Sequence, residues 1–162
     1  MKKLVLVCGP AGIGKSSFCK KYISEHPDEN IFIVSSDETR KGFYGAYDRF
    51  PPDNNMMTIY SDMVRQIDVL HATHDNVTVI VDSTMLTDER RLYFLNSCHK
   101  FDVNVCILLK LHDYSQCFER NKQRQTDKIV PEEVIRSMIS KYTDPSESTA
   151  KLFDIVETIY KD

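Results

Sequence analysis

The sequence lacks the features of membrane-bound, secreted or repetitive proteins. No apolar run approaches the roughly 20 residues that a membrane-spanning helix needs. The run at residues 4–8 is too short for the apolar part of a secretion signal. Internal repeats and low-complexity segments are absent as well. With 162 residues, of which 41% are hydrophobic and 28% charged, we expect one globular domain with a buried core.

Cysteine pairs at metal-binding or redox spacing are also missing. The five cysteines include no C-x-x-C pair. Two of them, Cys8 and Cys106, fall in apolar runs that are typical of buried strands, where a thiol is usually a small hydrophobic side chain. We therefore expect a reduced, intracellular protein without a structural metal.

An excess of positive charge is the third absence. The formal net charge is −3, with 21 lysines and arginines against 24 aspartates and glutamates. A protein that coats nucleic acid by releasing many counterions needs a broadly basic surface. If the substrate is a polynucleotide, we expect contacts with few phosphates through a local patch. The sequence predicts no membrane partner and does not determine an oligomeric state.

Short apolar runs alternate with longer helical segments along the chain. The runs suited to buried strands are 3–8, 31–34, 77–82 and 103–109, with a weaker one at 153–159. The helical candidates are 15–25, 55–73, 88–99, 114–123 and 131–142, and residues 143–148 are linker-like. This alternation predicts an α/β fold, a parallel sheet of four to five strands with helices on both faces. Ligands of such sheets bind beyond the carboxyl ends of the strands, so polar residues there are the functional candidates.

A complete phosphate loop follows the first predicted strand. Residues 9–16 read G-P-A-G-I-G-K-S and fit the pattern G-x-x-x-x-G-K-[ST]. The glycines let the backbone wrap closely, so that successive N–H groups and a helix N-terminus point at one anion. Lys15 is then placed to reach the β- and γ-phosphates, and the Ser16 hydroxyl to ligate Mg²⁺. The predicted nucleotide-binding residues are Gly9, Pro10, Ala11, Gly12, Ile13, Gly14, Lys15, Ser16 and Ser17.

Polar residues follow the second predicted strand, at the same sheet edge as the phosphate loop. Asp37 could accept a proton from an acceptor hydroxyl, or orient that hydroxyl in line with the γ-phosphate. Arg40, one helical turn later, could bind an acceptor phosphate through its planar guanidinium group. The alternative is that Ser35, Ser36 or Asp37 only caps a short helix. These two roles are compatible, and the segment alone does not decide between them.

Asp82 ends the third predicted strand, and three interpretations of it are open. An apolar run that ends in Asp resembles a Walker B strand, which would place Asp82 near Mg²⁺. Alternatively, Asp82 faces the acceptor site and holds Arg40 in an ion pair, or it only starts a turn. Farther along, Thr87 with Arg90 and Arg91 indicates a helix start followed by solvent-exposed charge.

The densest positive charge lies in residues 117–128, after the fourth predicted strand. Arg120 and Arg124 are four residues apart, a spacing that places them on one helix face. In a phosphoryl-transfer enzyme, such a pair on a mobile lid stabilises charge on the transferring phosphate and excludes water. An exposed basic helix end is the alternative, but the position in the chain favours a lid at about residues 113–131.

Residues 42–52 form an aromatic, irregular stretch. Its rings could stack on a nucleobase with Arg49 beside them. The favoured interpretation is that Phe43, Tyr44 and Phe50 fasten the loop to the core.

Together, four segments resemble the kinase domain of the phage-type polynucleotide 5′-hydroxyl kinases. The segments are 9–16, 36–40, 82–91 and 119–138, and their order and spacing hold from residue 1 to about residue 140. The resemblance implies a P-loop kinase fold with a helical lid. It also implies ATP- and Mg²⁺-dependent transfer of the γ-phosphoryl group to the 5′-hydroxyl of a DNA or RNA end.

The resemblance implies roles for the matching residues on the donor side and in catalysis. Lys15 and Ser16 would hold the donor phosphates and Mg²⁺. Asp37 would be the general base for the 5′-hydroxyl. Arg124 would be the transition-state arginine, with Arg120 a lid residue near the donor nucleotide.

On the acceptor side, Arg40 would bind the adjacent phosphate, with Asp82 supporting it rather than acting as the main metal ligand. Some members of the family carry a 3′-phosphatase domain with a D-x-D-G motif, which this sequence lacks, so phosphatase activity is not expected. Residues 42–54 do not align, which leaves open a hydroxymethylated base in DNA or a small molecule as the acceptor. A nucleotide-dependent switch is disfavoured, because a switch needs no acceptor base.

Overall fold

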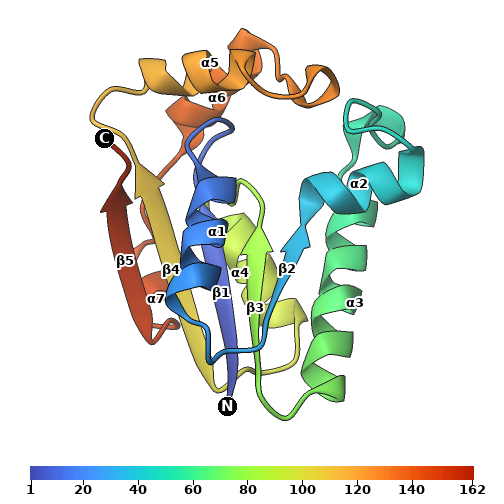
Figure 1. The fold of residues 1–162 in the computed structure, drawn as a ribbon, viewed down its shortest axis with the longest axis vertical. Helices are drawn as coiled ribbons and strands as arrows, with labels where there is room; N and C mark the ends of the chain where they lie inside the picture. Colours follow the sequence, from blue (N-terminus) through green and yellow to red (C-terminus); the bar gives the residue numbers. More distant parts are fainter.

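The computed structural model describes residues 1–162 and confirms the predicted α/β fold with one parallel sheet (Figure 1). The strand order across the sheet is β2-β3-β1-β4-β5. All neighbouring strands pair in parallel, so their carboxyl ends lie at the same edge. The strands are β1 (Lys2–Cys8), β2 (Ile31–Ser35), β3 (Val77–Asp82), β4 (Val103–Lys110) and β5 (Ile155–Tyr160).

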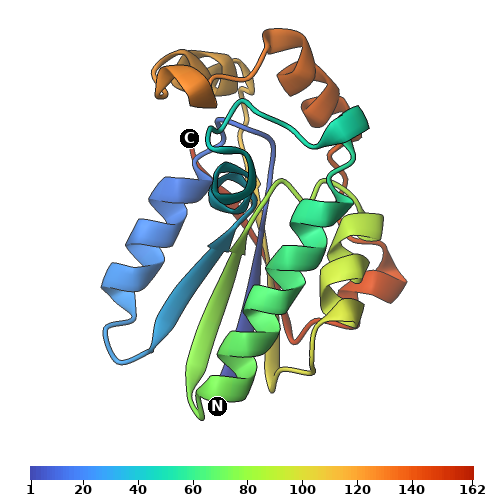
Figure 2. The same ribbon diagram turned by 90° about the vertical axis from the view of Figure 1, so that its right-hand side faces the viewer.

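Helices cover both faces of the sheet and its carboxyl edge. Figures 1 and 2 show α1 on one face, α3, α4 and α7 on the other, and α5 and α6 above the carboxyl ends. Two short 3₁₀ turns, Pro52–Asn54 and Thr126–Lys128, lie in the connections after α2 and α5. The helices are α1 (Lys15–Glu25), α2 (Ser36–Tyr44), α3 (Met57–Thr73), α4 (Asp88–Ser97), α5 (Ser115–Lys122), α6 (Glu132–Lys141) and α7 (Glu147–Ala150).

The predicted strands and helices agree with the observed ones to within two residues at each end. The linker interpretation of residues 143–148 is wrong in part, because α7 begins at Glu147. Its N-terminus is capped by Ser146, whose side chain accepts a hydrogen bond from the backbone N–H of Thr149. A helix of four residues has no apolar periodicity, so its sequence resembles that of a loop. No helix combines the length and the apolar composition that a membrane crossing needs.

Two hydrophobic clusters lie on opposite sides of the sheet. Successive residues of a strand face opposite ways. On β1, Leu4 and Leu6 accordingly pack with residues of α3 and α4, whereas Val5 and Val7 pack with residues of α1 and α5. Because both faces are covered, β1 is apolar over most of its length, as expected for a central parallel strand.

The prediction that Arg90 and Arg91 are both solvent-exposed is wrong for Arg91, which has a relative exposure of 0%. Its Nη2 donates to the carbonyl groups of Leu86 (3.2 Å) and Thr143 (2.5 Å), and its Nη1 lies 3.4 Å from a carboxylate oxygen of Asp88. Arg91 therefore ties the loop after β3 to the segment after α6. A run of charges in a sequence does not show which of its members turns inward.

The aromatic stretch is also anchored differently from the prediction. Phe43 and Phe50 are about half exposed, at 50% and 51%. Tyr44 does pack against the core, as expected. The buried ring is that of Tyr47, with a relative exposure of 6%, and its hydroxyl group donates to Glu38 of α2. The loop is thus fastened to α2 through Tyr47.

We expect Arg91→Ala to lower the free energy of unfolding by about 3 kcal/mol, because the buried carbonyl groups and Asp88 would lose their donor. The adjacent Arg90→Ala is the matched control. It removes a partly exposed side chain that forms no ion pair, so the loss should be about 1 kcal/mol or less. Urea unfolding of both variants measures the difference. Equal losses would contradict the structural role of Arg91.

Candidate active site

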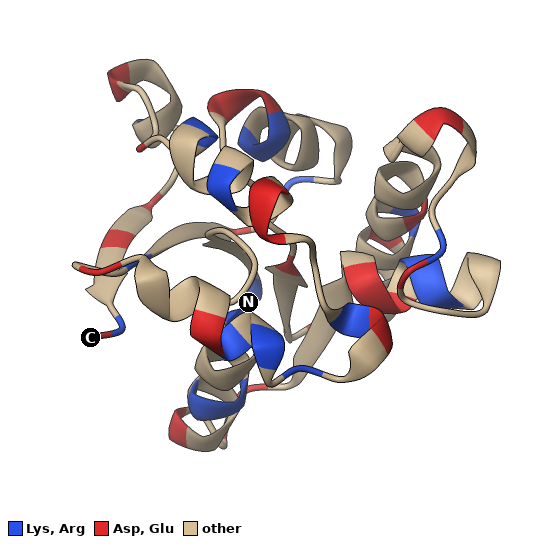
Figure 3. Cartoon of the chain, turned by 90° about the horizontal axis from the view of Figure 1, so that it is seen from above, with Lys and Arg blue, Asp and Glu red and all other residues tan.

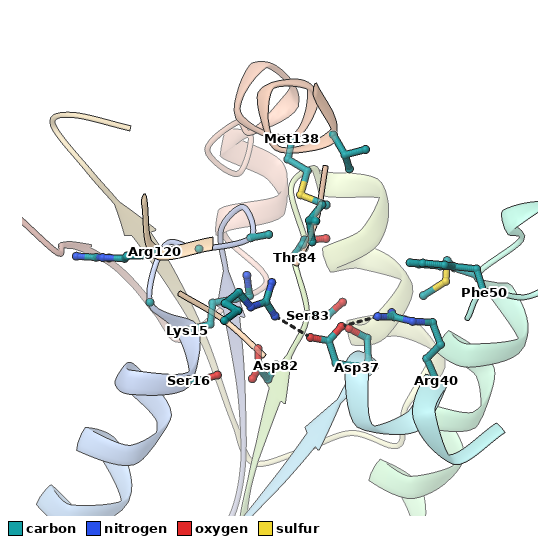
Figure 4. A pocket seen from close by; sticks show the side chains of 18 of the residues that line it. Lys15, Ser16, Asp37, Arg40, Phe50, Asp82, Ser83, Thr84, Arg120 and Met138 are labelled. Atoms are coloured by element: carbon teal, nitrogen blue, oxygen red, sulfur yellow. Dashed lines mark hydrogen bonds and ion pairs between the residues drawn. The ribbon is translucent and has the colours of Figure 1, made fainter. Parts of the chain in front are cut away.

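A cavity of about 420 Å³ opens at the carboxyl edge of the sheet (Figure 4). Its walls come from the phosphate loop, the first turn of α2, the end of β3 and the lid segment. The predicted residues that line it are Ala11, Gly12, Gly14, Lys15, Ser16, Asp37, Arg40, Asp82, Arg120 and Arg124. The structure therefore brings the predicted catalytic and acceptor-binding residues around one cavity with the phosphate loop.

The phosphate loop is held by its neighbours on two sides. The Gly9 N–H donates to the carbonyl group of Thr84 at 2.8 Å, which fixes the start of the loop to the segment after β3. Gly12 has a φ of +82°, and a Cβ atom there would lie 2.4 Å from the carbonyl oxygen of Cys117 in α5. Position 12 therefore requires glycine for both its backbone conformation and its space.

Lys15 lies over the phosphate loop. Its Nζ donates to the carbonyl oxygens of Gly9 at 2.9 Å and Pro10 at 3.0 Å. Desolvation lowers the pKa of Lys15, and the negative charges of Asp82 and Asp37 oppose that shift. An anionic phosphate in the loop would be a stronger partner for this ammonium group than the two carbonyl groups.

At the start of α2, one residue caps the helix and another faces the cavity. Ser35 is the capping residue, since its side-chain oxygen accepts the backbone N–H of Glu38 at 3.3 Å. The carboxylate of Asp37 is therefore available to the cavity. Its Oδ1 accepts from Arg40 Nη2 at 3.1 Å, and its Oδ2 accepts from Arg124 Nη2 at 3.4 Å (Figure 4). One carboxylate thus joins an arginine of α2 to an arginine of the lid.

Arg40 is buried and held in a defined orientation. Only 8% of the residue is exposed, and its Nε donates to the carbonyl group of Tyr47 at 2.9 Å. Its guanidinium group also lies 4.4 Å from the ring centre of Phe50. The expected ion pair between Arg40 and Asp82 is not present, because the carboxylate that pairs with Arg40 is that of Asp37.

Asp82 lies between Lys15 and Asp37 in Figure 4. Burial raises the pKa of Asp82, the charge of Lys15 lowers it, and the neighbouring carboxylate of Asp37 raises it further. Its surroundings are therefore those of the donor side of the cavity. They fit an aspartate near Mg²⁺, as in a Walker B strand, better than an aspartate that holds Arg40 in an ion pair.

Arg120 and Arg124 do not share a helix face, contrary to their spacing of four residues. Helix α5 ends at Lys122, so Arg124 lies beyond it and reaches Asp37. Arg120 remains on the helix, where its Nη1 donates to the carbonyl group of Ile13 in the phosphate loop at 2.8 Å. The two arginines consequently contact opposite sides of the cavity.

A second cavity of about 560 Å³ adjoins the first and shares Asp37, Arg40 and Arg124 with it. It lies between the loop after α2 and the lid. Much of its wall is apolar, and the side chains involved include Phe50, Met56, Ile129, Val130, Pro131 and Val134. The sequence pattern does not assign these side chains to a cavity wall, because a short apolar run such as Ile129 to Pro131 is equally typical of residues that pack into a core.

The residues present suit a nucleotide with Mg²⁺. No group of three or more His, Cys, Asp or Glu side chains is placed to hold a metal ion by itself. Mg²⁺ is commonly bound by one or two protein oxygens together with substrate phosphates. The exposed hydroxyl group of Ser16 and the carboxylate of Asp82, both on the cavity wall, are a donor set of this kind.

Charge around the cavity is mixed in sign. Figure 3 looks down on the carboxyl edge and shows basic and acidic positions interspersed on the surrounding helices. The positive charge at the cavity comes from single side chains that line it, which are Lys15, Arg40, Arg120 and Arg124.

Comparisons with known proteins identify a family and related sequences. A model of the AAA domain family matches residues 4–145. The L-seryl-tRNA(Sec) kinase of Methanococcus maripaludis is 26% identical over 147 residues, which are 88% of this chain and 53% of that kinase.

Two solved structures share the fold. A chain of the Pnkp1/Rnl/Hen1 RNA repair complex has a TM-score of 0.70 at 20% identity, over 94% of this chain and 46% of that one. A gluconokinase from Sinorhizobium meliloti 1021 has a TM-score of 0.59 at 16% identity, over 98% and 82%. This chain spans about half the length of the tRNA kinase and of the RNA repair chain. At these identities the solved structures show a common fold and no more.

We expect Gly12→Ala to weaken ATP binding at least about ten-fold, because the new Cβ would strain the loop and displace α5. Gly42→Ala is the matched control. Gly42 lies within α2 with open space around it, so the change should leave ATP binding intact and slightly stabilise the helix. Isothermal titration calorimetry with MgATP compares them. Wild-type affinity in Gly12→Ala would contradict the close approach of α5.

Proposed function

The chain belongs to the AAA domain family and has the P-loop kinase fold, and we propose that it transfers the γ-phosphoryl group of ATP to the 5′-hydroxyl of a polynucleotide. The observation that carries the proposal is the Asp37 carboxylate, which is paired with Arg40 and Arg124 beside the phosphate loop. A nucleotide-dependent switch has no use for such a group, whereas a kinase needs a carboxylate where its acceptor hydroxyl binds.

On the donor side, the phosphate loop holds ATP. Its backbone N–H groups and the N-terminus of α1 surround the phosphates, and Lys15 exchanges its two carbonyl partners for phosphate oxygens. Ser16 and Asp82 would hold Mg²⁺ together with those phosphates, and the ion would neutralise charge on the β- and γ-phosphate groups. Arg120, bonded to the loop carbonyl of Ile13, lies near the donor nucleotide.

At the reaction centre, Asp37 orients the acceptor hydroxyl and accepts its proton as the oxygen attacks the γ-phosphorus. The bond between that phosphorus and the β–γ bridging oxygen breaks, and ADP departs. Arg124 is 3.4 Å from Asp37 in the free protein. It turns from this carboxylate to the transferring phosphoryl group, where it stabilises the developing charge.

On the acceptor side, Arg40 is the phosphate-binding residue. Its Nε donates to the carbonyl group of Tyr47 and its Nη2 donates to Asp37, whereas its Nη1 has no hydrogen-bond partner in the protein. The apolar wall around Phe50 in the second cavity suits a nucleobase or sugar next to that phosphate. The names of two relatives, a seryl-tRNA kinase and an RNA repair complex, support a nucleic acid acceptor.

Incubation of the protein with γ-labelled ATP and a 5′-OH oligonucleotide tests the proposal. We expect label on the 5′ end, and loss of most of it in Asp37→Asn with ATP binding intact, because the amide cannot accept the proton. Glu38→Gln is the matched control, since Glu38 bonds Tyr47 outside the reaction centre.

Label on internal bases or on an added small-molecule hydroxyl would instead identify a different acceptor, and label only in free phosphate would indicate a hydrolase or switch. Near-normal turnover in Asp37→Asn would contradict the assignment of the base.

A further inference from the structure

Arg90, on the first turn of α4, forms an unusual stack at the surface. Its guanidinium carbon lies 4.0 Å from the ring centre of Tyr60 and 5.5 Å from that of Tyr93. Its Nη1 lies 3.6 Å from the sulfur of Met57. These three contacts hold a long, otherwise flexible side chain in one place.

The charge of Arg90 is not neutralised within the protein. Arg40, Arg91 and Arg124 each have a carboxylate oxygen within 4.0 Å, whereas none lies that close to Arg90. A thioether sulfur is a weak acceptor, so the N–H groups of Arg90 are largely available. A guanidinium group that is fixed in position but lacks an anionic partner is prepared to bind an anion from outside.

The position of Arg90 relates it to the acceptor site. Tyr60, on which Arg90 stacks, lines the first cavity together with Met56 and Arg40. Burial raises the pKa of Tyr60, and the charges of Arg90 and Arg40 both oppose that rise, so both cations lie near this phenol. Arg124 and Arg40 pair with Asp37 and line the cavity, whereas Arg90 is connected to the cavity only through Tyr60, so Arg90 is the outermost of the three cations.

We propose that Arg90 binds a phosphodiester group of the polynucleotide acceptor, at least one nucleotide farther from the reacting 5′ end than the phosphate at Arg40. This rests on the proposed function. A planar guanidinium group fits phosphate oxygens through two parallel hydrogen bonds, and such backbone contacts set the register of a strand without reading its sequence. An acceptor with a single phosphate would reach Arg40 and end there.

A series of acceptors of increasing length tests this site. KM and kcat are measured for a nucleoside 3′-monophosphate, a dinucleotide, a trinucleotide and an octanucleotide, each with a 5′-hydroxyl group. We expect Arg90→Ala to raise KM about ten-fold for the octanucleotide, with kcat unchanged, and to leave KM for the nucleoside 3′-monophosphate at the wild-type value. The slope of log KM against log salt for the octanucleotide should fall by about one.

Arg65→Ala is the matched control. Arg65 lies on α3 five residues beyond Tyr60, is exposed and pairs with Asp62, so its loss should leave all KM values unchanged. Urea unfolding establishes that Arg90→Ala is folded.

If the wild type phosphorylates oligonucleotides and Arg90→Ala has wild-type KM values, or raises them equally for all acceptors, the phosphodiester site is wrong and the proposed function stands. If the wild type phosphorylates none of these acceptors, the proposed function itself is wrong.

Discussion

The paired charges of Asp37, Arg40 and Arg124 are the interaction on which the rest of the site depends. Two guanidinium groups from different elements approach one another only because a carboxylate lies between them, with one oxygen for each. The arrangement joins the lid to α2 and orients the acceptor-side arginine before any substrate binds. It also gives Asp37 one partner that substrates can replace. When a phosphate binds Arg124, the carboxylate oxygen that Arg124 leaves can accept a hydrogen bond from the acceptor hydroxyl.

The fold holds these three residues in place from outside the cavity. The parallel sheet brings the end of β2, the phosphate loop and the end of β3 to one edge. Close contact of Gly12 with the Cys117 carbonyl group sets the distance between the loop and α5. After α6, the hydroxyl group of Tyr142 donates to the carbonyl groups of Cys8 (3.2 Å) and Leu109 (2.8 Å), which ties the end of the helix that follows the lid to β1 and β4.

The features that a local sequence pattern determines could be predicted, and those that depend on long-range packing could not. The buried strands, the phosphate loop and the position of Asp37 at the sheet edge follow from apolar runs and glycine spacing. The i,i+3 spacing of Asp37 and Arg40 on a short helix was a signal for their ion pair, but the prediction assigned Arg40 to Asp82 instead. The burial of Arg91 and the turn of Arg124 away from α5 result from long-range contacts that no single segment encodes.

The central claim is that Asp37 and Arg124 act on the same transition state, one on the attacking oxygen and the other on the transferring phosphoryl group. A double-mutant cycle tests it most directly, with kcat measured at saturating ATP and 5′-OH oligonucleotide for Asp37→Asn, Arg124→Ala and both together. Arg124→Ala alone should lower kcat by about 10³-fold. The double variant should be little slower than the slower single variant, because the two residues work as one unit. Losses that multiply, or an effect of Arg124→Ala confined to KM, would contradict the account.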